Sequence, residues 1–411
     1  MGRKMVNTLA YEASHPWLTF RLDLSHSGYA LWLLLGEASS KVEHIAGVPL
    51  LKEDAATLHR MWLIKGALAT SAIEGNTLTE EQVALRLEGR ERLAPSQEYL
   101  GVEIDNMLRL FNRLVEELAG DQMEAICPER VCRFDSEILR DLPMEDTVHP
   151  GEYRTLSVWV GRYRGAPAED CPWLIARLCE WLNGPDFRTD QPELVRPLGI
   201  LKAIVAHLYM VWIHPFDDGN GRTARLLEFQ LLLEAGLPVP AAHLLSDHYN
   251  RTRSEYYRQL DQASNSSGDI VPFLTYSVQG LVDGLREQLA FIRQHQWELA
   301  WRNFVHGELS GESAPQRRRR HLVLDLAAVQ RSIPIHELPD ISPRVARDYA
   351  VVSPRSLVRD VEAVLEQGLL VGNKDGFRAN RERILAFLPV AKRKPEAPQA
   401  PRKRGRPKKR S

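Results

Sequence analysis

The amino-acid sequence predicts a mainly α-helical protein with a short β-hairpin in its middle, a small C-terminal α+β module and a disordered basic tail. Three observations support this. Much of the first 300 residues repeats apolar side chains at helical spacing. Residues 150–161 combine a glycine with alternating β-forming residues, which is typical of a hairpin. Residues 391–411 are rich in proline, lysine and arginine and cannot bury a core.

Length and composition set further bounds. A chain of 411 residues favours two to three domains. The net charge of −1 conceals ten Lys and Arg in residues 391–411, so the remainder sums to about −10. Four cysteines without CxxC spacing argue against a zinc site or a disulfide framework and favour a reducing cytoplasm. We expect neither a signal peptide nor a membrane anchor.

The first 119 residues predict an N-terminal helical region. Apolar residues recur from Leu51 to Ile73 at the spacing of an amphipathic helix, which should end at Gly75. Residues 80–92 and 101–118 continue the helical pattern.

Residues 197–213 predict a buried helix, because they are apolar on most sides. Lys202 and His207 interrupt the run, which is also short for a membrane span, so we interpret it as a core helix. Proline at position 215 should end this helix near His214. A second apolar helix then runs to Gly236. The stretch between them is therefore a loop joining two core helices.

This loop has the composition of a phosphate site. Glycines at a helix start let backbone N–H groups approach an anion closely. Arg222 and Arg225 lie three residues apart and could both reach that anion. Asp218 makes sense beside a phosphate when Mg²⁺ lies between them, and His214 is then placed as a general base. Taken singly, each feature has an ordinary alternative: a helix cap, a turn or a solvated face.

The whole segment, HPFDDGNGRTAR, resembles the HPFx[D/E]GNGRxxR signature of the Fic family at every fixed position. The resemblance implies a nucleotidyltransferase that moves AMP from ATP onto a Ser, Thr or Tyr hydroxyl of a protein, with release of pyrophosphate. It implies His214 as catalytic base and Asp218 as the Mg²⁺ ligand. The implied ATP-binding residues of the loop are Gly219, Asn220, Gly221, Arg222, Thr223, Ala224 and Arg225.

Residues 70–76 resemble the inhibitory motif [S/T]xxxE[G/N] of autoinhibited Fic proteins, with Thr70, Glu74 and Gly75 at its defined positions. The resemblance implies that Glu74 pairs with Arg225 and occupies space needed by the γ-phosphate. A carboxylate there competes with phosphate for the same donors. The alternative is an ordinary helix end followed by a turn.

The predicted hairpin at residues 150–161 resembles the Fic flap, whose exposed strand edge pairs with the target segment. By this resemblance Val158, Trp159 and Val160 contact the target. The generic alternative is a surface β-turn.

Residues 252–260 resemble the family's NRxxYYxxL segment, which helps to form the adenine pocket. Tyr256 and Tyr257 match it, whereas Thr252 replaces the asparagine, which puts one polar contact in doubt. Asn265 is a candidate for a second contact to the base. We place the catalytic core at residues 120–300.

Residues 301–320 predict a linker that ends in four arginines. Residues 321–390 then give a helix, a second helix opened by Ser353-Pro354, and a hairpin, an order that resembles a winged helix. Arg355 and Arg359 would face DNA from the second helix, although Asp360 and Glu362 dilute the charge. The alternative is a module for protein contacts or dimerisation.

The tail, residues 391–411, contains Arg404, Gly405, Arg406 and Pro407 with basic neighbours, which resembles an AT-hook. An extended Arg-Gly-Arg fits a narrow A·T minor groove.

The sequence thus predicts an autoinhibited, Mg²⁺- and ATP-dependent adenylyltransferase whose partner is a protein substrate or the chain itself, with DNA as a further partner. The rivals are a DNA-binding regulator with the Fic fold as nucleotide sensor, a transferase with another donor, and a deAMPylase in which Glu74 positions water.

Overall fold

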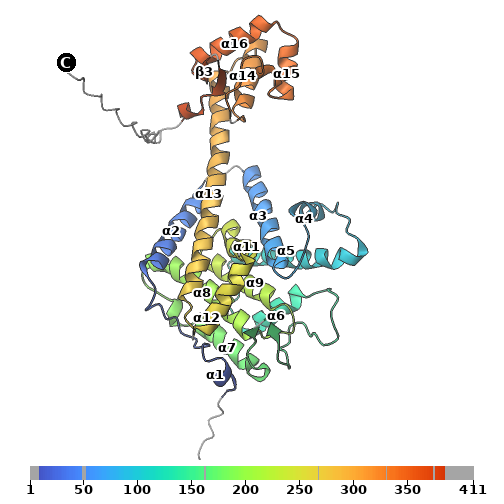
Figure 1. Cartoon of the computed structure of the whole chain (residues 1–411), viewed down its shortest axis with the longest axis vertical. Coiled ribbons are helices and arrows are strands. Elements are labelled where there is room, and N and C mark those ends of the chain that lie inside the picture. Colours follow the sequence, from blue (N-terminus) through green and yellow to red (C-terminus); the bar gives the residue numbers. More distant parts are fainter. Residues whose placement is uncertain are drawn as a thin grey trace, which may run out of the picture. The chain divides into compact units, whose positions relative to one another are not determined.

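The structure is a computed structural model that describes residues 9–48, 52–161, 163–266, 268–329, 331–373 and 375–384. It divides into two compact units, Met1–Ile292 and Arg293–Ser411, each with its own buried hydrophobic core. The mainly helical prediction is confirmed (Figure 1). The first unit thus spans the predicted N-terminal region and the predicted catalytic core up to Ile292, and the described residues of both contribute to one hydrophobic core.

The first unit is built from helices and one two-stranded sheet. Its helices are α1 (Tyr11–Ser14), α2 (Tyr29–Ala46), α3 (Lys52–Ala72), α4 (Glu80–Leu87), α5 (Glu98–Ala119), α6 (Pro128–Ile138), α7 (Cys171–Leu182), α8 (Pro192–Ile213), α9 (Asn220–Glu234), α10 (Val239–Ala242), α11 (Leu244–Arg251) and α12 (Arg253–Asn265). Strands β1 (Trp159–Val160) and β2 (Tyr163–Arg164) pair antiparallel, with Trp159 opposite Arg164. Helix α13 (Val271–Glu308) begins in this unit and ends in the second.

Helices α8 and α9 form the centre of the first unit and pack against each other (Figure 1). Helix α8 also contacts α2 and α7, while α9 contacts α3, α5 and α6. By length and composition α8 could cross a membrane, but most of it is buried within this helical unit, as expected of a core helix. Packing on several sides explains why its sequence is apolar all round.

Helix α3 ends as predicted, in a turn fixed by glycine. Gly75 has a φ of +107°, a conformation that other residues rarely adopt. The next residue, Asn76, donates its side-chain amide to the Leu100 carbonyl and to Glu103 Oε2 on α5, both at 2.9 Å. The end of α3 is therefore held in place by α5.

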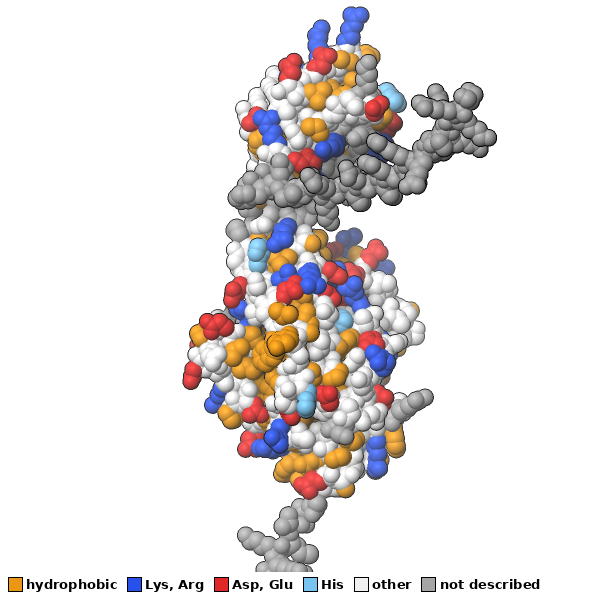
Figure 2. Space-filling model, turned by 60° about the vertical axis from the view of Figure 1, so that its left-hand side comes forward, with side chains coloured by type: hydrophobic (Ala, Val, Ile, Leu, Met, Phe, Trp, Pro, Cys, Tyr) orange, Lys and Arg blue, Asp and Glu red, His pale blue; other side chains and the backbone are white. Residues whose placement is uncertain are grey.

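Helix α2 carries a group of exposed apolar side chains. Tyr29, Trp32 and Leu33 share one face of the helix and are 90%, 39% and 73% exposed. Figure 2 brings this side of the first unit forward and shows hydrophobic side chains gathered among charged ones.

The second unit contains the end of α13 followed by α14 (Ala314–Leu326), α15 (Pro343–Ala350), α16 (Pro354–Glu366) and the antiparallel strands β3 (Leu370–Asn373) and β4 (Gly376–Ala379). Ile333 forms an additional bridge to Phe377 on β4. The predicted second helix and hairpin are present. Helix α15 was not predicted, although Ser342-Pro343 repeats the Ser-Pro pair that opens α16. In the structure Ser342 Oγ accepts from the Val345 N–H.

The predicted linker at residues 301–320 is wrong, because α13 continues to Glu308 and α14 begins at Ala314. The arginine run lies on α14 and is used inside the unit. Arg318 and Arg319 form ion pairs with the buried Asp360, at 3.1 and 2.7 Å. We had expected Asp360 to dilute the positive charge on the outward face of α16. Because Asp360 is buried and paired with these arginines, it does not do so.

Candidate active site

The loop between α8 and α9 is held by its own side chains. His214 closes α8 with a left-handed backbone (φ +51°). The side-chain amide of Asn220 donates to the Phe216 carbonyl at 2.8 Å and accepts from the Phe216 N–H at 2.9 Å. Phe216 is buried and its ring stacks on Tyr153. Phe216 thus anchors the loop, and Asn220 closes it rather than facing a ligand.

The buried Arg154, which was not among the predicted site residues, holds the start of this loop in place. Arg154 donates from Nε to the His214 carbonyl at 2.7 Å and from Nη1 to the Leu156 carbonyl at 2.6 Å. Its Nη2 donates to the carbonyl of Ala166, which follows β2. Arg154 therefore ties the hairpin to the end of α8. In the sequence, only the position of Arg154 just before the hairpin could have pointed to this role.

Two glycines of the loop leave room for neighbouring carboxylates. Gly219 has a φ of +78°, and a Cβ there would collide with Asp135 on α6. Burial raises the pKa of Asp135 to about 7. A Cβ on Gly221 would collide with Glu74 Oε1. The two glycines therefore allow a carboxylate to lie against the loop backbone on each side of the loop.

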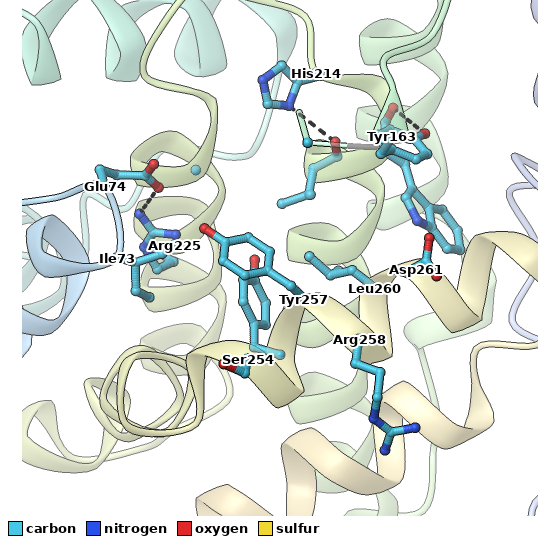
Figure 3. Close-up of a pocket in the computed structure, with 15 residues that line it drawn as sticks. Ile73, Glu74, Tyr163, His214, Arg225, Ser254, Tyr257, Arg258, Leu260 and Asp261 are labelled. Carbon is cyan, nitrogen blue, oxygen red and sulfur yellow. Dashed lines mark hydrogen bonds and ion pairs between the residues drawn. The ribbon is translucent and has the colours of Figure 1, made fainter. Parts of the chain in front are cut away.

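A pocket of about 520 Å³ opens beside this loop (Figure 3). Its lining combines the end of α3, the hairpin, the end of α8, the start of α9 and one face of α12. The lining residues are Ile73, Glu74, Gly161, Tyr163, Val211, Trp212, His214, Gly221, Arg225, Ser254, Tyr256, Tyr257, Arg258, Leu260 and Asp261.

Glu74 and Arg225 meet in this pocket, as the resemblance implied. Glu74 Oε1 lies 2.6 Å from Arg225 Nη2, which also donates to the Thr70 carbonyl at 2.9 Å. The Arg225 guanidinium lowers the pKa of Glu74 against the opposing effect of burial. Figure 3 shows Glu74 and Arg225 facing each other in this pocket, which Gly221 also lines. An anion at this helix start would meet the Glu74 carboxylate there.

Arg222 does not join Arg225 at the pocket, although the two lie three residues apart. Its Nη1 pairs with Glu103 on α5 and its Nη2 with Asp218, both at 3.0 Å. Glu103 Oε2 also accepts from Asn76. Glu103 thus connects Arg222 to the turn that carries Glu74, a role that sequence spacing could not reveal.

Asp218 lies on the exposed side of the loop, beside Arg222 and the Gly219 N–H. The described residues contain no cluster of three or more Asp, Glu, His or Cys that could hold a metal by itself. One accessible carboxylate nevertheless fits Mg²⁺, which commonly takes one or two protein carboxylates and completes its shell with phosphates and water.

Besides Gly219, Asn220 and Arg222, four further residues predicted to bind ATP lie away from the pocket lining. Ala224 is fully buried, and Thr223 faces Asp135 at 3.5 Å. Thr252 Oγ1 lies 2.6 Å from the Tyr276 hydroxyl, and Asn265 is exposed at the end of α12. Ser254, Arg258 and Asp261 line the pocket instead, with Tyr257. These residues are spaced three and four apart on α12, which places them on neighbouring positions of the helix surface. This spacing could have identified them from the sequence.

His214 is the imidazole in the pocket. Its Nδ1 lies 3.4 Å from the Val211 carbonyl, which leaves Nε2 to accept a proton. Burial is the main cause that lowers the pKa of His214 to about 4; Arg154 lowers it further, while Glu74 and Asp218 oppose the shift. The imidazole is therefore neutral at pH 7.

The predicted flap is a hairpin at the mouth of this pocket. Gly161 and Tyr163 line the cavity, whereas Trp159 is 65% exposed. The Val158 carbonyl accepts from the Gly165 N–H, so the pairing extends one step beyond the strands. The backbone of Val160 pairs with Tyr163.

The outward face of α16 carries Arg355 and Arg359, both exposed as predicted. Arg378 on β4 pairs with Glu382 at 2.7 Å. The predicted AT-hook, Arg404 to Pro407, lies outside the described residues.

These features define a helical domain with a glycine-rich helix start, a half-buried imidazole and a carboxylate that lies beside Gly221 and Arg225. Residues 125–232 match the model of the Fic/DOC family. The chain therefore contains a Fic domain, which spans α6 to α9, including the hairpin and the loop.

Curated proteins that are similar to half of this chain include two protein adenylyltransferases. The chain is 32% identical over 212 residues to protein adenylyltransferase fic-1 of Caenorhabditis elegans, covering 50% of this chain and 37% of that protein. It is 31% identical over 213 residues to protein adenylyltransferase Fic of Nematostella vectensis, covering 50% and 44%. The chain thus spans less than half the length of these relatives.

A solved structure supports the fold. The crystal structure of a Fic family protein from Desulfovibrio desulfuricans G20 has a TM-score of 0.52 and 21% identity. The match covers 85% of this chain and 95% of that one. At this identity the likeness shows the fold alone.

Proposed function

We propose that this chain is a protein adenylyltransferase that transfers AMP from ATP to a Ser, Thr or Tyr hydroxyl and is restrained by Glu74. The observation that carries the proposal is the 2.6 Å contact of Glu74 with Arg225, in a pocket that also holds His214. The similarity to proteins named adenylyltransferases favours ATP as the donor.

The arrangement supplies each part of the transfer. The hydroxyl oxygen of the target bonds to the α-phosphorus as the bond to the pyrophosphate oxygen breaks, and His214 Nε2 takes the hydroxyl proton. Once Glu74 moves away, Arg225 and the N–H groups at the start of α9 can hold the phosphates. Mg²⁺ bound at Asp218 would offset their negative charge.

The experiment is transfer of label from α-labelled and γ-labelled ATP to the chain itself or to proteins of a lysate. The proposal expects label from the α position alone. Transfer from the γ position would indicate a phosphotransferase, and release of AMP from a modified protein would favour the deAMPylase alternative.

The pH dependence of transfer follows from the low pKa of His214. The base works when neutral, so activity is present above about pH 4 and is lost as the pH falls through that value. The rate of the Glu74→Gly chain should therefore stay nearly constant from pH 8 to 5.5. A half-loss near pH 6.5, the ordinary value for histidine, would contradict this environment for His214.

We further propose that the second unit binds DNA through α16, with the basic tail as an added contact. Supporting observations are the order of α14, α15, α16 and the hairpin, and the exposed guanidinium groups of Arg355 and Arg359. Phosphate contacts from such arginines position a helix on the duplex. The ten basic residues of the tail add charge of the same sign.

Replacing Arg355 and Arg359 together with alanine should weaken DNA binding roughly tenfold. It should also lower the slope of log affinity against log salt concentration by the amount that about two phosphate contacts contribute. Gel shifts at two salt concentrations measure both effects. The control is Arg251→Ala with Arg286→Ala, an equal loss of charge from the first unit. A chain ending at residue 390 tests the tail on A·T-rich DNA. Equal shifts from all these proteins would contradict the proposal.

A further inference from the structure

A chain of buried polar groups runs beneath the pocket and joins five helices, α8, α9, α11, α12 and α13. His207 Nε2 on α8 lies 2.9 Å from the Tyr256 hydroxyl on α12, and His207 Nδ1 lies 3.8 Å from Glu228 Oε2 on α9. Glu228 Oε1 accepts from the Tyr249 hydroxyl at 3.0 Å, and that hydroxyl lies 3.1 Å from Ser277 Oγ on α13. All five side chains are at most 2% exposed.

Each central member of this chain shares an element with a pocket residue. His207 shares α8 with the pocket residues Val211 and Trp212, and His214 follows directly after the end of this helix. Glu228 follows Arg225 by three residues on α9. Tyr256 itself lines the pocket beside Tyr257. The buried chain therefore joins the helices that carry the base, the phosphate ligand and the aromatic wall.

Among the described residues, the contact of His207 Nε2 with the Tyr256 hydroxyl is the one hydrogen bond that the His207 ring makes, because Nδ1 faces Glu228 at 3.8 Å without a hydrogen-bond partner. Burial lowers the pKa of His207 well below its ordinary value and raises that of Glu228 to about 8, so both are largely neutral at pH 7. A neutral imidazole has one donor and one acceptor. The Tyr256 hydroxyl can donate to Nε2 while Nδ1–H faces Glu228. A buried hydroxyl that loses its partner is destabilised, so the bond favours a single orientation of Tyr256.

We propose that His207 and Glu228 are positioning residues that fix the Tyr256 ring as a wall of the nucleotide pocket and thereby set the affinity for ATP. They act through Tyr256 and do not touch the reacting atoms. The identity of the nucleotide rests on the proposed function.

The test is the Kd for ATP, measured by calorimetry on the full chain in the Glu74→Gly background, so that Glu74 does not compete. Tyr256→Phe keeps the ring and removes the hydroxyl, and should raise the Kd roughly three- to tenfold, the effect of one buried hydrogen bond. The same loss should appear in KM for ATP rather than in kcat. His207→Phe should act similarly, and the two changes together should not add, because they break the same contact.

Two further variants separate positioning from stability. Tyr209→Phe removes a buried hydroxyl from α8 that accepts from the Phe20 N–H at 3.2 Å, outside the pocket lining. It should lower the melting temperature and leave the Kd for ATP unchanged. Glu228→Gln preserves shape and polarity and should keep the parent Kd, whereas Glu228→Leu should raise it.

An unchanged Kd in Tyr256→Phe would overturn the positioning role, as would an equal rise in Tyr209→Phe. If the Glu74→Gly parent itself bound no ATP, the proposed function would fail together with this inference. Binding by the parent with no effect of the Tyr256 change would overturn the inference alone.

Discussion

Replacing Glu74 with glycine is expected to raise the rate of AMP transfer about 10- to 160-fold, the range that corresponds to a charge-assisted hydrogen bond of about 1.5–3 kcal/mol. In the structure the Glu74 carboxylate bonds to Arg225 and occupies the space above Gly221. Removing it frees the guanidinium for phosphate and removes repulsion between two anions. The measurement is the initial rate of labelled AMP incorporation at saturating Mg²⁺.

The matched control is Glu81→Ala, which removes an exposed carboxylate from the first turn of α4, outside the pocket. It should leave the rate unchanged. Glu74→Gln, which removes the charge but keeps an oxygen that can bond to Arg225, should give an intermediate rate. A Glu74→Gly chain no faster than the parent would show that this carboxylate does not restrain the enzyme.

Replacing His214 with alanine in the Glu74→Gly background should reduce transfer by about 10²- to 10⁴-fold, the usual contribution of a general base. The reason is the position of the imidazole, which is neutral at pH 7 and has Nε2 left to accept the hydroxyl proton. Single-turnover transfer of AMP measures the chemical step directly.

His336→Ala is the control for this substitution, because His336 is exposed in the second unit. It should transfer AMP at the parent rate. Melting curves show whether each variant is folded. Transfer by folded His214→Ala at the parent rate would exclude His214 as the base.

Local features of the site were predictable from the sequence. The residue before Pro215 should leave the helix, and it does so at His214. The glycines of the loop predicted close approach, and a Cβ at Gly219 or Gly221 would collide with a carboxylate. These predictions succeeded because they depend on residues close together in the chain.

The Glu74–Arg225 contact could not come from spacing, because 151 positions separate the two residues. It was predicted through the resemblance to autoinhibited Fic proteins. The structure then added Glu103, which links Arg222 to the same turn.

The structure departs from the sequence predictions where a polar residue had two possible directions. Arg222 was expected at the phosphate, but a buried carboxylate on α5 holds it. Thr252 was expected at the nucleotide, but its hydroxyl contacts Tyr276. The arginine run at residues 317–320 suggested an exposed linker, yet Asp360 draws two of its members into the second unit. Such choices depend on tertiary partners that a single sequence does not reveal.

The most direct test of the central claim is the intact mass of the Glu74→Gly chain and its target after incubation with ATP and Mg²⁺, followed by peptide mapping. The account predicts an added adenosine monophosphate on a Ser, Thr or Tyr side chain, which disappears when His214 is also replaced by alanine. An added phosphate, or an added AMP that persists without His214, would contradict it.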